Sequence, residues 1–311
     1  MSQTGISINL IWIVFNMRKV IAYILYLLYL PKIKMESKRT DSVLTIYGHD
    51  ISRCAFEELV EWLLKRNYVF INQYELYDYL NGKANNGKKL VWLSFDDGWK
   101  SNYDNVFPVL KKYDIPATIF VATKGIEDGY FWFNVAKENR DAPYYKEIQE
   151  LWEMPNKDRV AIIRKLERKS KVRKTMTPLE LKEMTESGLV SWGNHTDDHV
   201  MSDNCMIEEL QGEILLCQKK MNQWTGADCN FIYSYPNGNM DAQSENLIKS
   251  IGFKMAATTE MERAYPNTSS FNIPRTEFKE ACVKENVLQI YNIWTPFFDR
   301  IKHIFGIKNK K

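Results

Sequence analysis

The chain has 311 residues, of which 45% are hydrophobic, 13% aromatic and 26% charged, and its formal net charge is +3. This composition can fill a sizeable core, and it excludes the disordered, collagen-like and coiled-coil classes. The small net charge argues against a nucleic-acid-binding protein, because such a protein needs a strong basic field. The five scattered cysteines contain no C-x-x-C pair, so they predict neither a disulfide framework nor a cysteine-rich zinc site.

The N-terminal residues 1–42 are predicted to be a membrane-associated segment followed by a linker. Residues 8–30 are apolar and aromatic, but Arg18 and Lys19 interrupt them. A central cation costs a spanning helix roughly 2.5–3.5 kcal/mol, so a simple membrane span is disfavoured. Three tyrosines at helical spacing favour an uncleaved helix at a membrane surface. A cleaved signal peptide and a helix packed on the domain are the alternatives, and the charged residues 32–42 are predicted to be the linker.

The folded domain is predicted to span residues 43–290, with strands and helices in alternation. Strands are expected over 43–47, 90–95, 117–122, 190–192, 231–233 and 253–258, and helices over 55–66, 73–80, 103–113, 206–224 and 242–250. This alternation is typical of a parallel sheet or barrel. Residues 128–189 interrupt it with an aromatic cluster and charged sequence, which predicts a helical insertion on the outside of the sheet.

The C-terminal residues 291–311 are predicted to form a basic amphipathic helix and tail. Thr295 and Pro296 have the form of a helix cap and first helical residue, and Gly306 is expected to end the helix. One side of this helix is apolar and aromatic and the other is basic, which suits an anionic membrane surface. The alternative is a final helix packed on the barrel.

Three polar motifs follow predicted strands. Asp96 and Asp97 come directly after the strand at 90–95, and His195 and His199 come after the strand at 190–192. Two imidazoles four residues apart, together with a carboxylate, are ligands typical of zinc, and three ligands leave a position for water, as in catalytic sites. His49 follows the first strand of the domain. Each motif alone also fits a polar turn, but active-site residues gather at the carboxyl ends of parallel strands.

These motifs resemble those of a known family. Ser94–Gly98 resembles the [ST]-F-D-D-G motif of the polysaccharide deacetylases, carbohydrate esterase family four, and His195–His199 resembles their H-[ST]-x-x-H motif. Tyr233–Gly238 is similar to the third motif, a groove wall centred on proline. The resemblance covers roughly residues 43–278 and implies a distorted (β/α)7 barrel. It also implies that Asp97, His195 and His199 hold one divalent ion, with Zn²⁺ as the first choice.

The resemblance further implies the roles of the other site residues. Asp96 would be the catalytic base and His49 the catalytic acid, while Tyr235 and the backbone N–H of Asn237 would bind the substrate. The family usually carries its catalytic histidine near the C-terminus, and the position of His49 at the front is similar to the circularly permuted branch that deacetylates poly-β-1,6-N-acetylglucosamine.

The third motif departs from the family pattern at its first residue. The arginine that usually begins it is replaced by Tyr233. Arg275 is the candidate to orient the base instead, and we group it with the substrate-binding residues.

The sequence therefore predicts a metal-dependent hydrolase that removes N-acetyl groups from a polysaccharide or oligosaccharide at the membrane of the cell envelope, with a lipid-linked glycan as one form of the substrate. The alternatives are a deformylase or other amide hydrolase acting on a lipid-linked aminosugar, and a non-catalytic carbohydrate-binding protein of the same fold. No nucleic-acid partner is expected, and the sequence predicts no oligomeric state.

Overall fold

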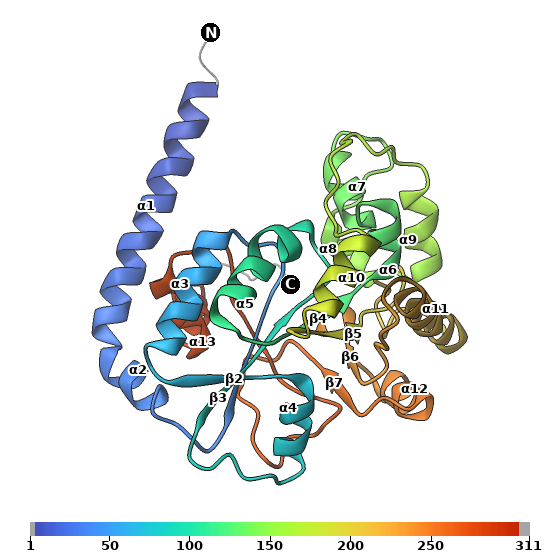
Figure 1. The fold of residues 1–311 in the computed structure, drawn as a ribbon. Coiled ribbons are helices and arrows are strands. Elements are labelled where there is room, and N and C mark those ends of the chain that lie inside the picture. Colours follow the sequence, from blue (N-terminus) through green and yellow to red (C-terminus); the bar gives the residue numbers. More distant parts are fainter. Residues whose placement is uncertain (1–3, 305–311) are drawn as a thin grey trace.

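Parallel strands form the centre of the molecule. The computed structural model describes the backbone of residues 4–304 and the side chains of residues 16–304. Within this range one curved sheet has the order β7-β6-β5-β4-β3-β1-β8, and β2 pairs with β3 beside this path (Figure 1). The strands are β1 Val43–Gly48, β2 Tyr68–Ile71, β3 Lys89–Phe95, β4 Ala117–Val121, β5 Val190–Asn194, β6 Ile232–Ser234, β7 Met255–Ala257 and β8 Thr276–Glu277. The expected barrel is thus confirmed in its coarser form, as a parallel α/β half-barrel.

The strand ends meet at one edge of the sheet. All strand pairs are parallel, with Gly48 opposite Phe95, Val121 opposite Asn194, and Tyr47 opposite Glu277. The strands β1 and β4 are buried along their whole length, as expected of continuous apolar runs in a parallel sheet. Residues that follow β1, β3, β5 and β8 are therefore brought together, although they lie far apart in the sequence.

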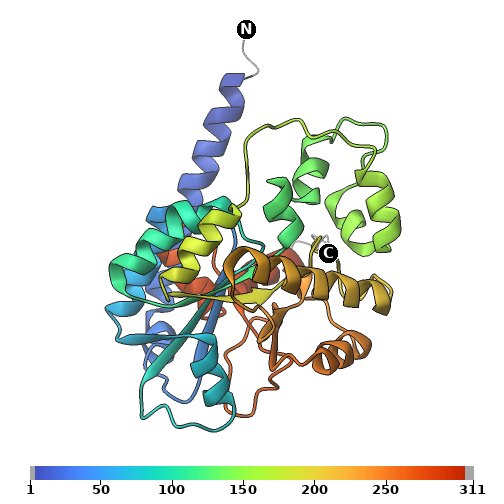
Figure 2. The same ribbon diagram turned by 45° about the vertical axis from the view of Figure 1, so that its right-hand side comes forward.

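Helices surround the sheet and give it its layers. Helices α3 and α13 lie toward one end of the sheet, with α1 beside α13, whereas α11 and α12 lie toward the other end (Figures 1 and 2). The helices are α1 Thr4–Leu28, α2 Leu30–Glu36, α3 Arg53–Leu64, α4 Gln73–Leu80, α5 Phe107–Tyr113, α6 Thr123–Asp128, α7 Trp132–Glu138, α8 Ile148–Glu153, α9 Asn156–Ile163, α10 Pro178–Glu186, α11 Ile207–Thr225, α12 Ala242–Ile251, α13 Val283–Ile290 and α14 Trp294–Ile304. A π-helical turn, Asn102–Val106, precedes α5, and a 3₁₀ turn, Pro236–Gly238, follows β6.

The N-terminal helix is continuous through its two cations. Helix α1 packs on α13, where Ala22 and Leu25 are buried and Arg18 pairs with Glu285. The alternative of a helix packed on the domain is therefore confirmed for this part of the segment. The prediction of a linker from residue 32 onward is wrong for its first residues, because α2 continues to Glu36 and buries Ile33 in the core. Among the described residues, no helix has the length and apolar character needed to cross a bilayer.

The predicted helical insertion is present, and the C-terminal helix begins slightly earlier than expected. Helices α7, α8, α9 and α10 lie within residues 128–189 (Figure 2). Helix α14 begins at Trp294, so Thr295 does not cap this helix. The Thr295 hydroxyl instead donates to Gln289 Oε1 at 2.9 Å. The predicted helix end at Gly306 lies outside the described residues.

Candidate metal and catalytic site

A cavity of about 400 Å³ lies where the strand ends meet. It holds all three polar motifs that the sequence predicted, since residues following β1, β3 and β5 line it together. The third motif contributes Asn237, and two helices of the insertion contribute further side chains. The lining residues are Tyr47, His49, Asp96, Asp97, Trp99, Phe133, Lys137, Trp152, His195, His199, Asn237, Thr259 and Glu277.

Asp97, His195 and His199 form a buried triad at the floor of this cavity. His195 Nε2 lies 3.4 Å and His199 Nε2 3.3 Å from the same atom, Asp97 Oδ1. One potential ligand atom from each residue lies within 4.8 Å of the other two. Burial opposes ionisation of Asp97, but the two imidazoles outweigh it and hold the pKa of this carboxyl well below its usual range.

The hydrogen bonds around the triad leave Asp97 Oδ1 and His195 Nε2 without donors, whereas His199 Nδ1 has no hydrogen-bond partner in the part of the chain that the structure describes. His195 Nδ1 lies 2.8 Å from the carbonyl oxygen of Ser234, which requires a proton on Nδ1 and leaves the lone pair of Nε2 facing Asp97. Trp99 Nε1 donates to Asp97 Oδ2 at 2.8 Å, and Asp97 Oδ1 has no hydrogen-bond partner among the described residues. Buried acceptors that face one another repel unless a proton or a metal ion lies between them, and one carboxylate with two imidazoles is a ligand set that fits a divalent metal ion.

The loops that carry the triad have backbone conformations that few residues adopt. Asp97 has φ 74°, Thr196 65° and His199 49°, all in the left-handed region. Thr196 secures its loop with two hydrogen bonds, from its own N–H to Asn194 Oδ1 at 2.9 Å and from Val200 N–H to its hydroxyl at 3.1 Å. Such local strain is typical of functional sites, where the surrounding structure must impose it.

Asp96 lies beside the triad and forms a bidentate ion pair with Arg275. The Arg275 nitrogens lie 2.7 and 2.8 Å from the two carboxylate oxygens and also reach the hydroxyls of Ser94 and Ser234, while Nε donates to the carbonyl of Thr258. Burial opposes ionisation of Asp96, but the charge of Arg275 outweighs it and lowers the pKa of this carboxyl. Asp96 is therefore held as a carboxylate in a fixed orientation.

Arg275 lies behind Asp96 rather than in the cavity. Its side chain is fully buried, so its assignment as a substrate-binding residue is wrong. Its position instead matches the other idea drawn from the sequence, that it orients the base. The position of the missing motif arginine is filled by Tyr233, which is fully buried and hydrogen-bonds through its hydroxyl to Ser202 at 3.0 Å. The guanidinium thus reaches Asp96 from the segment before β8 instead of from β6.

We expect Arg275→Met to destabilise the protein strongly. Removing one partner of a buried ion pair leaves the other charge uncompensated, at a cost of about 3–5 kcal/mol. Urea unfolding monitored by circular dichroism measures this change in the free energy of unfolding. Arg168→Met is the matched control, because Arg168 is exposed and bonds only to backbone carbonyls. Equal stability of the two variants would contradict the contribution assigned to the Arg275–Asp96 pair.

His49 lines the same cavity as the triad and is paired with Glu277. Its Nδ1 lies 3.2 Å from Glu277 Oε1, and its side chain remains 36% exposed. Burial disfavours the charged imidazolium, but the hydrogen bond to Glu277 and the charges of Asp97 and Asp96 outweigh it and raise the pKa of His49 to about 9. His49 is therefore protonated at neutral pH, as a general acid must be.

The aromatic wall of the cavity comes from residues other than the predicted one. Tyr235 was expected to contact the substrate, but it is fully buried and packs edge-on against Tyr233, so this assignment is wrong. Trp99 does line the cavity, together with Phe133 of α7 and Trp152 of α8. Phe133 packs edge-on against His199, with ring centroids 5.5 Å apart. The insertion therefore supplies one wall of the site.

Asn237, the remaining predicted substrate-binding residue, does line the cavity, in the left-handed conformation with φ 60°.

Glu277, Lys137 and Trp152 were missed by the sequence reasoning. Glu277 ends a strand of two residues, which is too short to show any periodic pattern. Lys137 and Trp152 belong to the insertion. The position of the insertion over the strand ends depends on tertiary packing, which no local sequence pattern shows. In the sequence, the one signal for Glu277 was its acidic side chain, two positions after Arg275.

The fold and the site define the class of the protein, an α/β half-barrel hydrolase with a metal-binding triad at the carboxyl ends of its strands. Residues 83–256, more than half of the chain, match the family described as polysaccharide deacetylase. The chain belongs to this family, whose members are hydrolases acting on carbon–nitrogen bonds other than peptide bonds. His49, Arg275 and Glu277 lie outside the matched residues, and the structure places them beside the motifs within.

A curated relative is similar to this chain in sequence, and two solved structures are similar to it in fold. The chain is 28% identical over 237 residues to poly-beta-1,6-N-acetyl-D-glucosamine N-deacetylase of Staphylococcus aureus (strain MSSA476), covering 74% of this chain and 68% of the relative. The fold is similar to that of the deacetylase PplD from Streptococcus pyogenes, with a TM-score of 0.60, 19% identity and coverage of 80% and 97% of the two chains. It is also similar to that of IcaB from Ammonifex degensii, with a TM-score of 0.59, 20% identity and coverage of 82% and 97%.

Proposed function

We propose that this protein is a metal-dependent deacetylase that hydrolyses the acetamide of N-acetylated glucosamine units in a glycan. The observation that carries the proposal is the arrangement of three functional groups in one cavity. The triad of Asp97, His195 and His199 lies in it, a carboxylate fixed by Arg275 lies beside the triad, and an imidazole paired with Glu277 lines the same cavity. Acetamide hydrolysis needs all three, since water must be activated, a proton accepted and a proton returned.

Asp97, His195 and His199 would hold the ion, and Zn²⁺ is the ion we propose because two imidazoles and one carboxylate are its typical ligands. When bound, a divalent ion there would supply Lewis acidity and make a water molecule more acidic. The Ser234 carbonyl and the Trp99 indole would orient two of the three ligands through their hydrogen bonds.

The other residues would move protons and stabilise charge. Asp96, an ionised carboxylate, would accept a proton from the attacking water. The backbone N–H of Asn237 would donate to the oxygen that becomes negative as the water attacks. His49, protonated at neutral pH, would give its proton to the departing amine, without which an amine is a poor leaving group.

The pairing of His49 with Glu277 predicts the high-pH side of the rate profile. Because the acid must be protonated and its pKa is raised to about 9, activity should be retained at neutral pH and fall as the pH rises through about 9. Glu277→Gln removes the charge that stabilises the imidazolium, so the pKa of His49 should fall and the loss of activity should begin about one pH unit lower.

The pH dependence of kcat/KM for wild type and Glu277→Gln measures this shift. Glu186→Gln is the matched control, because Glu186 lies exposed at the end of α10, and it should leave the profile unchanged. An alkaline limb at the same pH in Glu277→Gln and wild type would show that Glu277 does not set the acid.

A substrate panel tests the proposed reaction and separates it from its alternatives. Acetate release would be measured from oligomers of β-1,6-linked N-acetylglucosamine, because the curated relative is named for that polymer, and from β-1,4-linked oligomers. Formate release would be measured from a lipid-linked N-formyl aminosugar. The proposal expects acetate, fastest from the β-1,6-linked oligomers. Formate release without acetate would favour a deformylase, and binding without turnover would favour a carbohydrate-binding protein.

A further inference from the structure

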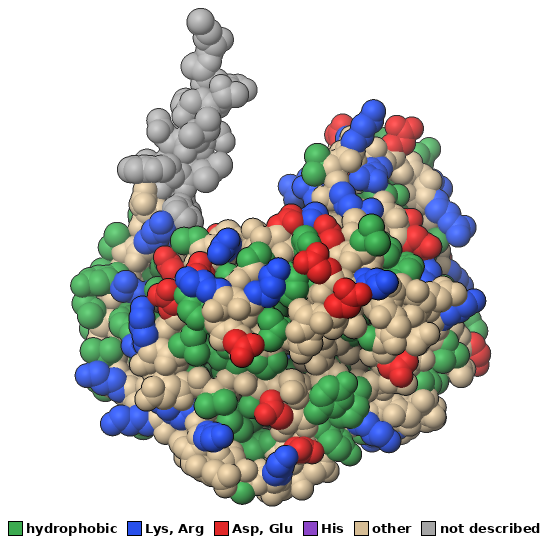
Figure 3. All heavy atoms as spheres, viewed as in Figure 1, with side chains coloured by type: hydrophobic (Ala, Val, Ile, Leu, Met, Phe, Trp, Pro, Cys, Tyr) green, Lys and Arg blue, Asp and Glu red, His purple; other side chains and the backbone are tan. Residues whose placement is uncertain are grey.

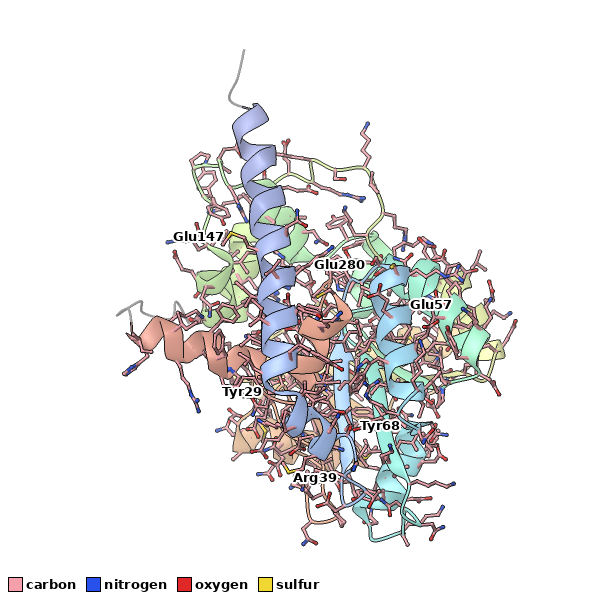
Figure 4. All side chains as sticks on the ribbon, turned by 90° about the vertical axis from the view of Figure 1, so that its left-hand side faces the viewer. Tyr29, Arg39, Glu57, Tyr68, Glu147 and Glu280 are labelled. Atoms are coloured by element: carbon pink, nitrogen blue, oxygen red, sulfur yellow. The ribbon has the colours of Figure 1, made fainter. Side chains whose placement is uncertain are left out.

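The outer face of α1 is apolar over the part of the helix whose side chains are described. The inner face is held on the domain by Ala22 and Leu25, which are buried. Figure 4 looks onto the outer side of this helix. Figure 3 shows hydrophobic side chains gathered at the left edge of the molecule, over the lower part of α1. We call this outer face the α1 stripe; its residues, each between 50% and 69% exposed, are Met17, Val20, Tyr23, Ile24, Leu27 and Leu28.

The α1 stripe is unusual among the exposed apolar residues of this protein. Its members follow one another at intervals of three or four residues, so they form one continuous surface along the helix. Other large apolar side chains that are exposed to a similar degree, such as Leu179 on α10 and Met206 before α11, stand apart from one another in the chain. A contiguous exposed apolar surface of this kind is typical of an interaction site, whereas single exposed residues are ordinary.

Cations surround the α1 stripe. Arg18 lies near the N-terminal end of the stripe, and its side chain is 53% exposed. Lys284 Nζ lies 5.4 Å from the centre of the Tyr23 ring. Exposed Lys34 and Lys38 follow the stripe in the chain. The acidic partner of Arg18, Glu285, is only 9% exposed, so the pair presents mainly its positive member to solvent. Residues 17–38 contain five lysines and arginines and one glutamate.

We propose that the α1 stripe docks onto an anionic lipid bilayer, lying in the plane of its interface. Apolar side chains at helical spacing with flanking cations are the surface that such a bilayer binds, through burial of apolar area and attraction to negative headgroups. A second copy of the chain fits less well, because a symmetric dimer through this face would bring the same cations together.

The α1 stripe and the catalytic cavity lie on different parts of the molecule. The N-terminal end of α1 and the helices of the insertion rise on the same side of the sheet (Figures 1 and 2). Docking through the outer face would tether the enzyme to the membrane, whereas the insertion, which supplies one wall of the catalytic cavity, lies across the molecule from α1 (Figure 1). The proposal goes beyond deacetylation and does not depend on it, because lipid binding is measured separately.

Vesicle flotation with the purified full chain tests the proposal. Wild type is expected to float with vesicles of phosphatidylcholine and phosphatidylglycerol, and much less with phosphatidylcholine alone. The triple variant Val20→Gln, Ile24→Gln and Leu27→Gln should lower the partition coefficient at least tenfold, about 1.4 kcal/mol. Glutamine keeps the helix propensity, and all three side chains are already exposed, so the fold should be retained. Leu179→Gln, at an even more exposed position on α10, is the control and should float like wild type.

A second variant tests the electrostatic part without changing the apolar surface. Lys34→Gln with Lys38→Gln should reduce flotation with anionic vesicles, while the weak flotation with phosphatidylcholine alone stays unchanged. Activity on a soluble glycan should be the same in the triple variant and wild type. Flotation of the triple variant equal to wild type, or flotation of wild type that ignores phosphatidylglycerol, would overturn the proposal. So would a wild-type dimer that the triple variant converts to a monomer, as measured by light scattering.

Discussion

Asp96→Asn is expected to lower kcat by roughly 10²–10⁴-fold while the protein keeps its metal. The amide has nearly the same shape as the carboxylate but cannot accept the proton of the attacking water. The triad does not include Asp96, since the three converging atoms belong to Asp97, His195 and His199. Acetate release and elemental analysis of the same preparation measure the two halves of this expectation.

Asp104→Asn is the control for this variant. Asp104 lies in the π-helical turn, its side chain is 51% exposed, and it pairs only with Lys100. It should leave kcat unchanged. Asp96→Asn should also melt at a lower temperature than the control, because Arg275 loses the charge that compensates it in the interior. Full activity in a folded Asp96→Asn protein would remove the role assigned to Asp96.

His195→Ala is expected to lose both metal and activity. The imidazole of His195 is almost completely buried, and the Ser234 carbonyl fixes its Nδ1. Alanine at this position therefore removes one of the three ligands and puts none in its place. Two ligands bind a divalent ion far more weakly than three. His303→Ala is the matched control, because His303 is exposed on α14, and it should keep both properties. A metal content of His195→Ala equal to that of the control would show that the ion binds elsewhere.

The strongly patterned elements of the fold were predictable from the sequence. Helix α4 has the predicted bounds, and β1 and β3 differ from the prediction by one residue at an end. In β1 and β3 a continuous apolar run is the signal, and in α4 the apolar residues are supported by a capping box of Asn72 and Glu75. Strands β2 and β8 and helix α13 were missed, because β2 and β8 are short and α13 has no capping side chain at Cys282 to mark its start. Their place in the fold is decided by packing against β1, β3 and α1.

The site residues that belong to a short polar motif at a strand end were predictable from the sequence. The triad, Asp96 and His49 all line one cavity, as expected from their positions at strand ends. The roles of Arg275 and Tyr235 could not be predicted in the same way, because both depend on which way a side chain points. Arg275 points inward to Asp96, and Tyr235 points into the core beside Tyr233. A sequence pattern places a residue near a site but does not state its orientation.

The most direct test of the central claim is acetate release by the purified protein before and after removal of its metal. We predict about one divalent ion per chain by elemental analysis, complete loss of acetate release after chelation, and recovery when Zn²⁺ is returned. Acetate release at the original rate by protein that contains no metal would contradict the account.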